Sequence, residues 1–317
     1  MQPLVSIICL CHNHQAFLGE AISSVLDQSY PNIEIIVVDD ASTDGSKDLL
    51  KKITGEHKLP FVDLQENIGN CAAFNKGWAL ARGKYTIDFA TDDVMFSHRI
   101  EKQVAFFKSL PEEYGVIYSN AIYIDAENNF LYDHFGNNAL MDFQPRFEGD
   151  IYKHVLQEYF IPPPCMMFKN SVLKSLNGYD ESLAYEDFDF WVRSSRNYRY
   201  GYQNECLTKI RKVRQSLSSK LYRKEDRQLL STYKVCLKAA ALNKSEEEDN
   251  SLKNRLRYEF KHAVLTENYK EADLFLKLIK QQGGINVATS FFEAIGKLNL
   301  PLTKLRNAYL RLRYGNR

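Results

Sequence analysis

The sequence predicts a doubly wound α/β domain followed by a helical region, and three observations support this fold class. Two stretches, LVSIICL (4–10) and IEIIVVD (33–39), are nearly continuous apolar runs, as expected of parallel strands that are covered on both faces. The segment between them, HQAFLGEAISSVLDQSY (14–30), carries apolar residues at helical spacing and stops before Pro31. Beyond about residue 222 the chain has little strand signal and reads as helical.

The elements that follow continue the alternation of strand and helix. Thr43 and Asp44 resemble helix-capping residues, so a helix is expected to begin there. Further helices are expected at 70–83 and near 98–110. Strands are expected at 61–65, 84–89, 115–120 and 121–125.

The C-terminal part predicts four helices, at 227–242, 252–265, 269–281 and 286–295. The acidic stretch NKSEEEDNS (243–251) is expected to be a solvated loop. A chain of 317 residues is long enough for about two domains of roughly 150 residues each. We therefore divide it into an α/β domain at 1–220 and a helical region at 221–317.

Composition excludes several classes of function. The chain has 41 Lys and Arg residues against 40 Asp and Glu residues, so nucleic acid is not expected as a partner. It has no apolar run of about 18 residues or more and no basic leader with a cleavage site, so neither a transmembrane helix nor a secretory signal is expected. The six cysteines show no zinc spacing, which favours reduced thiols in a cytoplasmic protein.

Polar residues follow three of the predicted parallel strands. Ligands of such sheets bind beyond the carboxyl ends of the strands, so these residues should converge on one rim. They are His12 and Asn13, Asp39 and Asp40, and Asp92 and Asp93.

The stretch FATDDVMF (89–96) places Asp92 beside Asp93 with no Lys or Arg next to them. Like charges repel, so a cation is one explanation for the pair. The other explanation is that the two carboxylates lie at a helix N-terminus, where negative charge is favourable. The local spacing does not decide between the two explanations. The turn after the first strand lacks glycine, and the chain has neither a dinucleotide fingerprint nor a P-loop. A bound nucleotide would therefore depend on Mg²⁺ or Mn²⁺, held by Asp92 and Asp93, to contact its diphosphate.

A second acidic group lies in NGYDESLAYEDFDFWVRSSR (177–196), where Glu181, Glu186, Asp187 and Asp189 precede or open a helix. Charge compensation at the helix N-terminus would explain them. A general base would explain them as well, because neighbouring apolar residues raise the pKa of a carboxylate.

Three motifs together resemble family 2 glycosyltransferases of the GT-A fold. The first is VSIICLCHNHQAFLGEAISSVLDQSYPNIEIIVVDDASTDGS, the second is ENIGNCAAFNKGWALARGKYTIDFATDDVMFSHRIEKQ, and the third is GYDESLAYEDFDFWVR. The resemblance covers about residues 4–218 and implies a Rossmann-like GT-A domain with a C-terminal helical extension. It also implies inverting transfer of a sugar from a nucleotide diphosphate sugar, such as a UDP-sugar, to an acceptor hydroxyl.

The resemblance assigns roles to individual positions. It implies that Asp40 reads the nucleobase, that His12 stacks on it, and that Asp93, with Asp92, holds the metal. It implies that Asp187 is the catalytic base, with Glu186 beside it, and that Trp191 lines the acceptor site. The other residues expected to bind the donor are Asn13, Asn67, Asp92, Arg211 and Arg214.

The chain departs from the family pattern at three positions. Ala90 stands where many members carry another Asp, and Phe74 stands where an Arg is common. Val213 replaces a His that often coordinates the metal. Two consequences are open: either the metal has fewer protein ligands, or Arg211 and Arg214 stabilise the diphosphate directly.

Two alternatives concern partners and place of action. The same scaffold could serve as a non-catalytic nucleotide-sugar binder or assembly protein. The basic, amphipathic segment 301–317 suits the inner face of a membrane and a lipid-linked glycan acceptor, but an ordinary packed helix or a homodimer contact would also explain it. The acceptor itself is expected to be a saccharide or a lipid-linked glycan.

Overall fold

The computed structural model describes residues 2–136, 146–213, 222–298, 301–303 and 306. Within these residues the packing divides the chain into two units. The first comprises residues 1–151 and 160–213, and the second comprises 152–159 and 214–317. The boundary expected at 220 falls in 214–221, outside the described residues, and stays a prediction.

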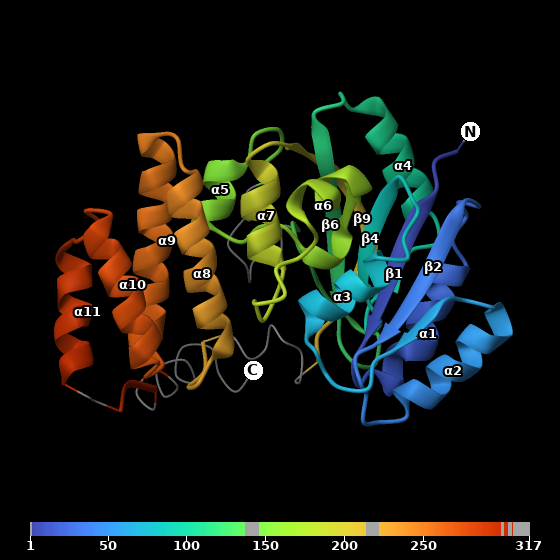
Figure 1. Cartoon of the computed structure of the whole chain (residues 1–317), viewed down its shortest axis with the longest axis horizontal. Coiled ribbons are helices and arrows are strands. Elements are labelled where there is room, and N and C mark those ends of the chain that lie inside the picture. Colours follow the sequence, from blue (N-terminus) through green and yellow to red (C-terminus); the bar gives the residue numbers. More distant parts are fainter. Residues whose placement is uncertain (1, 137–145, 214–221, 299–300, 304–305, 307–317) are drawn as a thin grey trace. The chain divides into compact units, whose positions relative to one another are not determined.

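The first unit is built on one mixed sheet in the order β3-β2-β1-β4-β8-β6-β9-β5, with β7 paired to β6 (Figure 1). Strands β3, β2, β1 and β4 are parallel neighbours, while β8 runs antiparallel to β4. The strands are β1 (Val5–Cys11), β2 (Ile33–Asp39), β3 (Phe61–Asp63), β4 (Tyr85–Ala90), β5 (Val94–Met95), β6 (Tyr114–Ile124), β7 (Phe130–Asp133), β8 (Met166–Lys169) and β9 (Arg199–Arg211).

Helices cover both faces of this sheet, so the predicted α/β fold class is confirmed. One face packs Ile7, Val37 and Ile87 against α1, α2 and α4. On the other face, α3 approaches so closely that a Cβ at Gly77 would lie 2.6 Å from Ile8. The helices of this unit are α1 (Gln15–Leu26), α2 (Ser46–His57), α3 (Asn70–Trp78), α4 (Arg99–Ser109), η1 (Pro163–Cys165), α6 (Asn170–Leu176) and α7 (Asp187–Ser195).

The second unit is helical. It contains α5 (Tyr152–Gln157), α8 (Arg227–Leu242), α9 (Glu246–Leu265), α10 (Tyr269–Gln281) and α11 (Val287–Lys297). Arg255 of α9 donates through Nε to the Leu156 carbonyl (3.1 Å), and the Tyr152 hydroxyl donates to Asn243 Oδ1 (2.9 Å). These bonds fix α5 among helices that lie 70 or more residues later in the chain.

Two expectations about single elements were wrong. Residues 246–251 are helical, because Ser245 caps α9 by accepting the Glu248 N–H and four acids in the first turn favour the positive end of the helix dipole. Residues 114–124 form one strand where two were expected. The pairing with β9 shifts register at Asn120, whose Oδ1 accepts the Ala121 and Phe135 N–H groups.

In the described part of the chain, no helix combines the length and the hydropathy that crossing a bilayer requires. Of the segment 301–317, only residues 301–303 and 306 are described, so its expected contact with a membrane or a second copy stays a prediction.

Candidate functional site

The expected nucleotide-binding residues gather where β1 and β2 end. His12 Nδ1 lies 2.7 Å from the Asp40 carbonyl oxygen, and the Asn67 amide nitrogen lies 3.2 Å from both ring nitrogens of His12. The parallel register of β1 with β2, which pairs Cys11 with Asp39, accounts for this meeting. The structure therefore brings together three of the residues that were expected to bind the nucleotide sugar.

The Asp40 carboxylate also holds the loop that leads into α3. It accepts the Ile68 N–H at 2.8 Å and the Gly69 N–H at 3.1 Å. Gly69, which directly precedes α3, has a φ of +87°, a backbone conformation that favours glycine. The role of Asp40 in reading a nucleobase stays a prediction.

Asn13 fastens the loop that follows β2. Its Oδ1 accepts the Thr43 N–H at 2.7 Å and the Asp44 N–H at 3.3 Å. Its own backbone is left-handed, with a φ of +61°, a conformation that Asn tolerates better than most residues. Asn13 thus shapes the rim, and direct contact with a donor stays a prediction.

Asp92 and Asp93 follow β4, the other neighbour of β1. The Asp93 side chain is buried and its Oδ1 accepts the Arg211 N–H at 2.8 Å. Burial, and then the charge of Asp92, raise the pKa of Asp93 well above its usual range. His14 Nε2 lies 3.9 Å from Asp92 Oδ2. Two carboxylates are therefore held together at a cost that a cation would offset.

This donor set fits a divalent cation that also binds the ligand. Among the described residues no cluster of three or more His, Cys, Asp and Glu side chains could hold a metal alone. Mg²⁺ and Mn²⁺ are commonly held by one or two carboxylates, with phosphate oxygens and waters completing the shell. Asp92 and Asp93 supply the two carboxylates, and a cation there would offset both the burial of Asp93 and the charge of Asp92, which raise its pKa.

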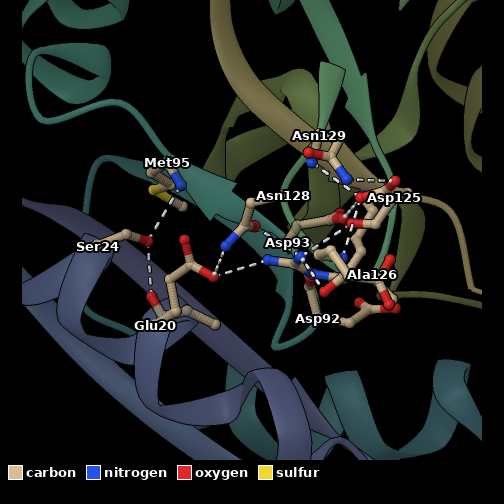
Figure 2. Close-up of polar contacts among 12 residues, drawn as sticks. Glu20, Ser24, Asp92, Asp93, Met95, Asp125, Ala126, Asn128 and Asn129 are labelled. Atoms are coloured by element: carbon tan, nitrogen blue, oxygen red, sulfur yellow. Dashed lines mark hydrogen bonds and ion pairs between the residues drawn. The ribbon is translucent and has the colours of Figure 1, made fainter. Parts of the chain in front are cut away.

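Arg211 lies beside this pair, but its guanidinium faces protein atoms. Nη2 forms an ion pair with Glu20 Oε2 at 2.8 Å and Nε donates to the Asp92 carbonyl at 2.9 Å. Figure 2 shows Glu20, Asn128, Asp92 and Asp93, which come from separate segments, near one another. The expected contact of Arg211 with a diphosphate stays a prediction, and Arg214 lies outside the described residues.

Glu186 precedes α7 and Asp187 begins it, in a second polar centre. Glu186 does not cap the helix through its side chain, and its Oε2 instead accepts the Asn70 amide at 2.5 Å. Asp187 Oδ1 is shielded from solvent and has no hydrogen-bond partner among the described residues. Compensation of the helix dipole does not account for the bond from Asn70, and the role of Asp187 as a catalytic base stays a prediction. Asp189 differs from them, because it pairs with Arg193 at 2.6 Å.

Asp88 of β4 is a third acid in this centre, and it was not among the residues predicted from the sequence. Burial raises the pKa of Asp187 well above its usual range, and the charges of Glu186 and Asp88 raise it further. Burial, and then the charge of Glu186, likewise raise the pKa of Asp88. We call Asp88, Glu186 and Asp187 the acid triad.

Some signals for the missed residues were present in the sequence. Asp88 interrupts the apolar strand KYTIDF, and an acid at such a position suggests a functional site. His14 lies in the same CHNHQ turn as His12. Asn70 gave no comparable signal, because its partner Glu186 is 116 residues away. Trp191, expected at the acceptor site, is buried and its indole N–H points at the Met166 sulfur at 3.3 Å.

Comparisons with known proteins agree with this architecture. The sequence model described as glycosyl transferase family 2 matches residues 6–176. The uncharacterised glycosyltransferase MJ1057 of Methanocaldococcus jannaschii is 30% identical over 218 residues, 66% of this chain and 71% of MJ1057. TuaG of Bacillus subtilis, whose name assigns it to teichuronic acid biosynthesis, is 39% identical over 106 residues, 33% of this chain and 42% of TuaG.

Solved structures support the fold. S. aureus TarS 1-349, in complex with UDP-GlcNAc, has a TM-score of 0.69 at 15% identity, with 98% of this chain and 92% of TarS 1-349 covered. The mannosyltransferase PcManGT from Pyrobaculum calidifontis, in complex with GDP-Man and Mn²⁺, has a TM-score of 0.60 at 16% identity, with 100% of this chain and 89% of PcManGT covered. The fold is therefore that of GT-A glycosyltransferases, and the chain belongs to glycosyl transferase family 2.

Proposed function

We propose that this chain is an inverting glycosyltransferase that moves a hexosyl or N-acetylhexosaminyl group from a UDP-sugar to an acceptor hydroxyl. The observation that carries the proposal is the acid triad, in which Asp187 Oδ1 is without a partner among the described residues and has a raised pKa. A carboxylate of this kind is a stronger base than an ordinary one and suits proton abstraction.

The proposed reaction is one in-line displacement. Asp187 takes the proton of the acceptor hydroxyl while that oxygen forms its bond to the anomeric carbon. The bond between the anomeric carbon and the diphosphate oxygen breaks at the same time, and its electron pair leaves with the diphosphate. Glu186, held by Asn70, would fix the position of the Asp187 carboxylate. Preorganised groups that match the developing charge are usually the largest contribution to such catalysis.

Asp92 and Asp93 are the proposed ligands of Mn²⁺ or Mg²⁺. A cation bound there would supply positive charge to the leaving diphosphate. His12 and Asn67 are proposed to contact the nucleoside, with Asp40 and Asn13 holding the surrounding loops.

Relatives suggest the donor and the pathway. TarS has been solved with UDP-GlcNAc, and PcManGT with GDP-Man, so these are the first donors to compare. The name of TuaG supports an acceptor that belongs to a surface polysaccharide or a related glycan. We place the enzyme in the cytoplasm, in accordance with its six free cysteines.

Calorimetry and a donor screen test the proposal. Titration of UDP with and without Mn²⁺ should give a signal that depends on the metal, and the screen should release UDP from one UDP-sugar when acceptor is present. Metal-dependent binding without turnover of any nucleotide sugar would favour the non-catalytic binder instead. Absence of nucleotide binding would contradict both.

A further inference from the structure

The guanidinium of Arg211, the last residue of β9, is enclosed by protein. Only 1% of its side chain is exposed, and its Cζ lies 4.6 Å from the centre of the Phe17 ring. All three of its nitrogens donate to protein oxygens. The acceptors are the Asp92 carbonyl (2.9 Å from Nε), the Asp125 and Ala126 carbonyls (3.1 and 3.4 Å from Nη1), Asn128 Oδ1 (2.7 Å from Nη1) and Glu20 Oε2 (2.8 Å from Nη2).

The same residue holds both members of the acidic pair. Its Nε–H fixes the carbonyl of Asp92, and its backbone N–H binds the carboxylate of Asp93 at 2.8 Å. Two hydrogen bonds to adjacent residues restrict both the peptide plane and the side chain of this turn. Groups that hold metal ligands in this way orient them, and their loss commonly weakens metal binding about 10–100-fold.

The turn 125–129 is arranged to meet the guanidinium. Asp125 Oδ1 accepts the N–H groups of Glu127 and Asn129 at 3.0 and 2.8 Å, and Asn128 adopts a φ of +68°. This turn therefore presents the Asp125 carbonyl and the Asn128 amide to Arg211 (Figure 2). Glu20 of α1 completes the enclosure from a third segment, and 42% of its own side chain is exposed.

We infer that Arg211 is a positioning residue, which holds the Asp92–Asp93 turn in the geometry that a divalent cation needs and does not itself contact the diphosphate. The inference rests on the proposed function, because it assumes that this pair is the cation site. It also assigns Glu20, which the sequence did not single out, to the same task through its ion pair with Arg211.

The test separates cation binding from diphosphate binding. Mn²⁺ is titrated into the full chain without nucleotide and followed by electron paramagnetic resonance, and UDP is titrated by calorimetry at limiting and at saturating Mn²⁺. The variants are Arg211→Lys and Glu20→Ala. Arg199→Lys is the matched control, because Arg199 begins the same strand, is exposed, and its Nη1 lies 3.7 Å from Glu113 Oε1.

In Arg211→Lys we expect Mn²⁺ affinity to fall about 10–100-fold and UDP affinity to recover once Mn²⁺ is saturating. Glu20→Ala should show a smaller loss in the same direction, and Arg199→Lys should match the wild type. Glu20→Ala alone decides the matter if Arg211→Lys does not fold, since Glu20 is partly exposed.

Unchanged Mn²⁺ affinity in the folded variants, or UDP affinity that stays weak at saturating Mn²⁺, would overturn the inference. A wild-type chain that turns over a UDP-sugar without binding Mn²⁺ would also overturn it and leave the transferase function standing. A wild-type chain that binds Mn²⁺ but turns over no donor would contradict the proposed function alone.

Discussion

The side-chain amide of Asn70, the first residue of α3, donates a 2.5 Å hydrogen bond to Glu186, the residue that precedes α7. Burial raises the pKa of Glu186, and this hydrogen bond opposes the rise because it favours the charged form. One amide thus favours the charged form of a half-buried carboxylate beside the proposed base.

Replacing Asn70 by Ala should make the enzyme more sensitive to acid. Without the amide, the pKa of Glu186 rises further, so Glu186 and Asp187 as a pair take up protons at higher pH, and the acidic limb of the rate profile moves to higher pH. We expect kcat/KM to fall about three- to tenfold at the acidic end of the profile and much less at its alkaline end, where more of the carboxylates are ionised. A uniform loss across the pH range would contradict this account. Asn197→Ala, at an exposed position, is the control.

Replacing Asp187 by Asn should remove the proton acceptor and leave the nucleotide site intact. A general base contributes about 10²–10⁴-fold, so transfer should slow by at least about 100-fold in single-turnover assays. UDP affinity, measured by calorimetry with Mn²⁺, should remain near that of the wild type. Transfer at a near-normal rate would show that the proton goes elsewhere.

Asp88→Asn should stabilise the protein more as the pH rises. Burial raises the pKa of Asp88 above its value of about 4 in the unfolded chain, so the folded state binds a proton that the unfolded state has released. Stability is therefore lost as the pH rises through this window. The neutral amide has no such loss, and its midpoint of thermal unfolding should exceed that of the wild type by a few degrees at pH 8 and by less at pH 4.

The control for Asp88→Asn is Asp273→Asn, an exposed position in α10, whose effect on the unfolding midpoint should be small at both pH values. Equal midpoints for Asp88→Asn and wild type at every pH would mean that Asp88 is well solvated. In the folded Asp88→Asn variant the acidic limb of the rate profile should also move to lower pH, since Asp88 no longer raises the pKa of Asp187.

Two glycine-to-alanine substitutions should have opposite effects. A Cβ at Gly77 would lie 2.6 Å from a methyl of Ile8 and 2.8 Å from one of Val38, so α3 would be pushed from the sheet at a cost of about 1–3 kcal/mol. A Cβ at Gly55, within α2, meets nothing within 4 Å, and alanine there should stabilise by up to about 1 kcal/mol. Urea unfolding of both variants compares them. Similar changes in the free energy of unfolding for the two variants would show that α3 moves to accommodate the added methyl group at no cost.

The parallel strands could be predicted because a strand that is buried on both faces is a continuous apolar run in the sequence, as in LVSIICL and IEIIVVD. The helical start at 246–251 could not be read correctly, since acids are equally typical of a solvated loop and of a first helical turn. The strand 114–124 was predicted as two strands that divide after Asn120. The side chain of Asn120 bridges a register shift that the local sequence does not show.

The site was predictable where its residues follow strands, and less so where partners come from far along the chain. His12, Asp40, Asp92 and Asp93 lie after parallel strands that end at one edge. The enclosure of Arg211 depends on Glu20, on Asp92 and on the turn 125–129. Spacing in the sequence cannot show that these segments meet.

Helix α5 belongs to the helical unit, although its residues interrupt the α/β unit between positions 151 and 160. A chimaera that joins this chain to a relative at a single crossover near residue 214 would separate α5 from Arg255, which donates to its Leu156 carbonyl. Grafting the helical unit onto another transferase would thus require residues 152–159 to be exchanged as well, and evolution by simple addition of a C-terminal module would have had to reshape this inner segment at the same time.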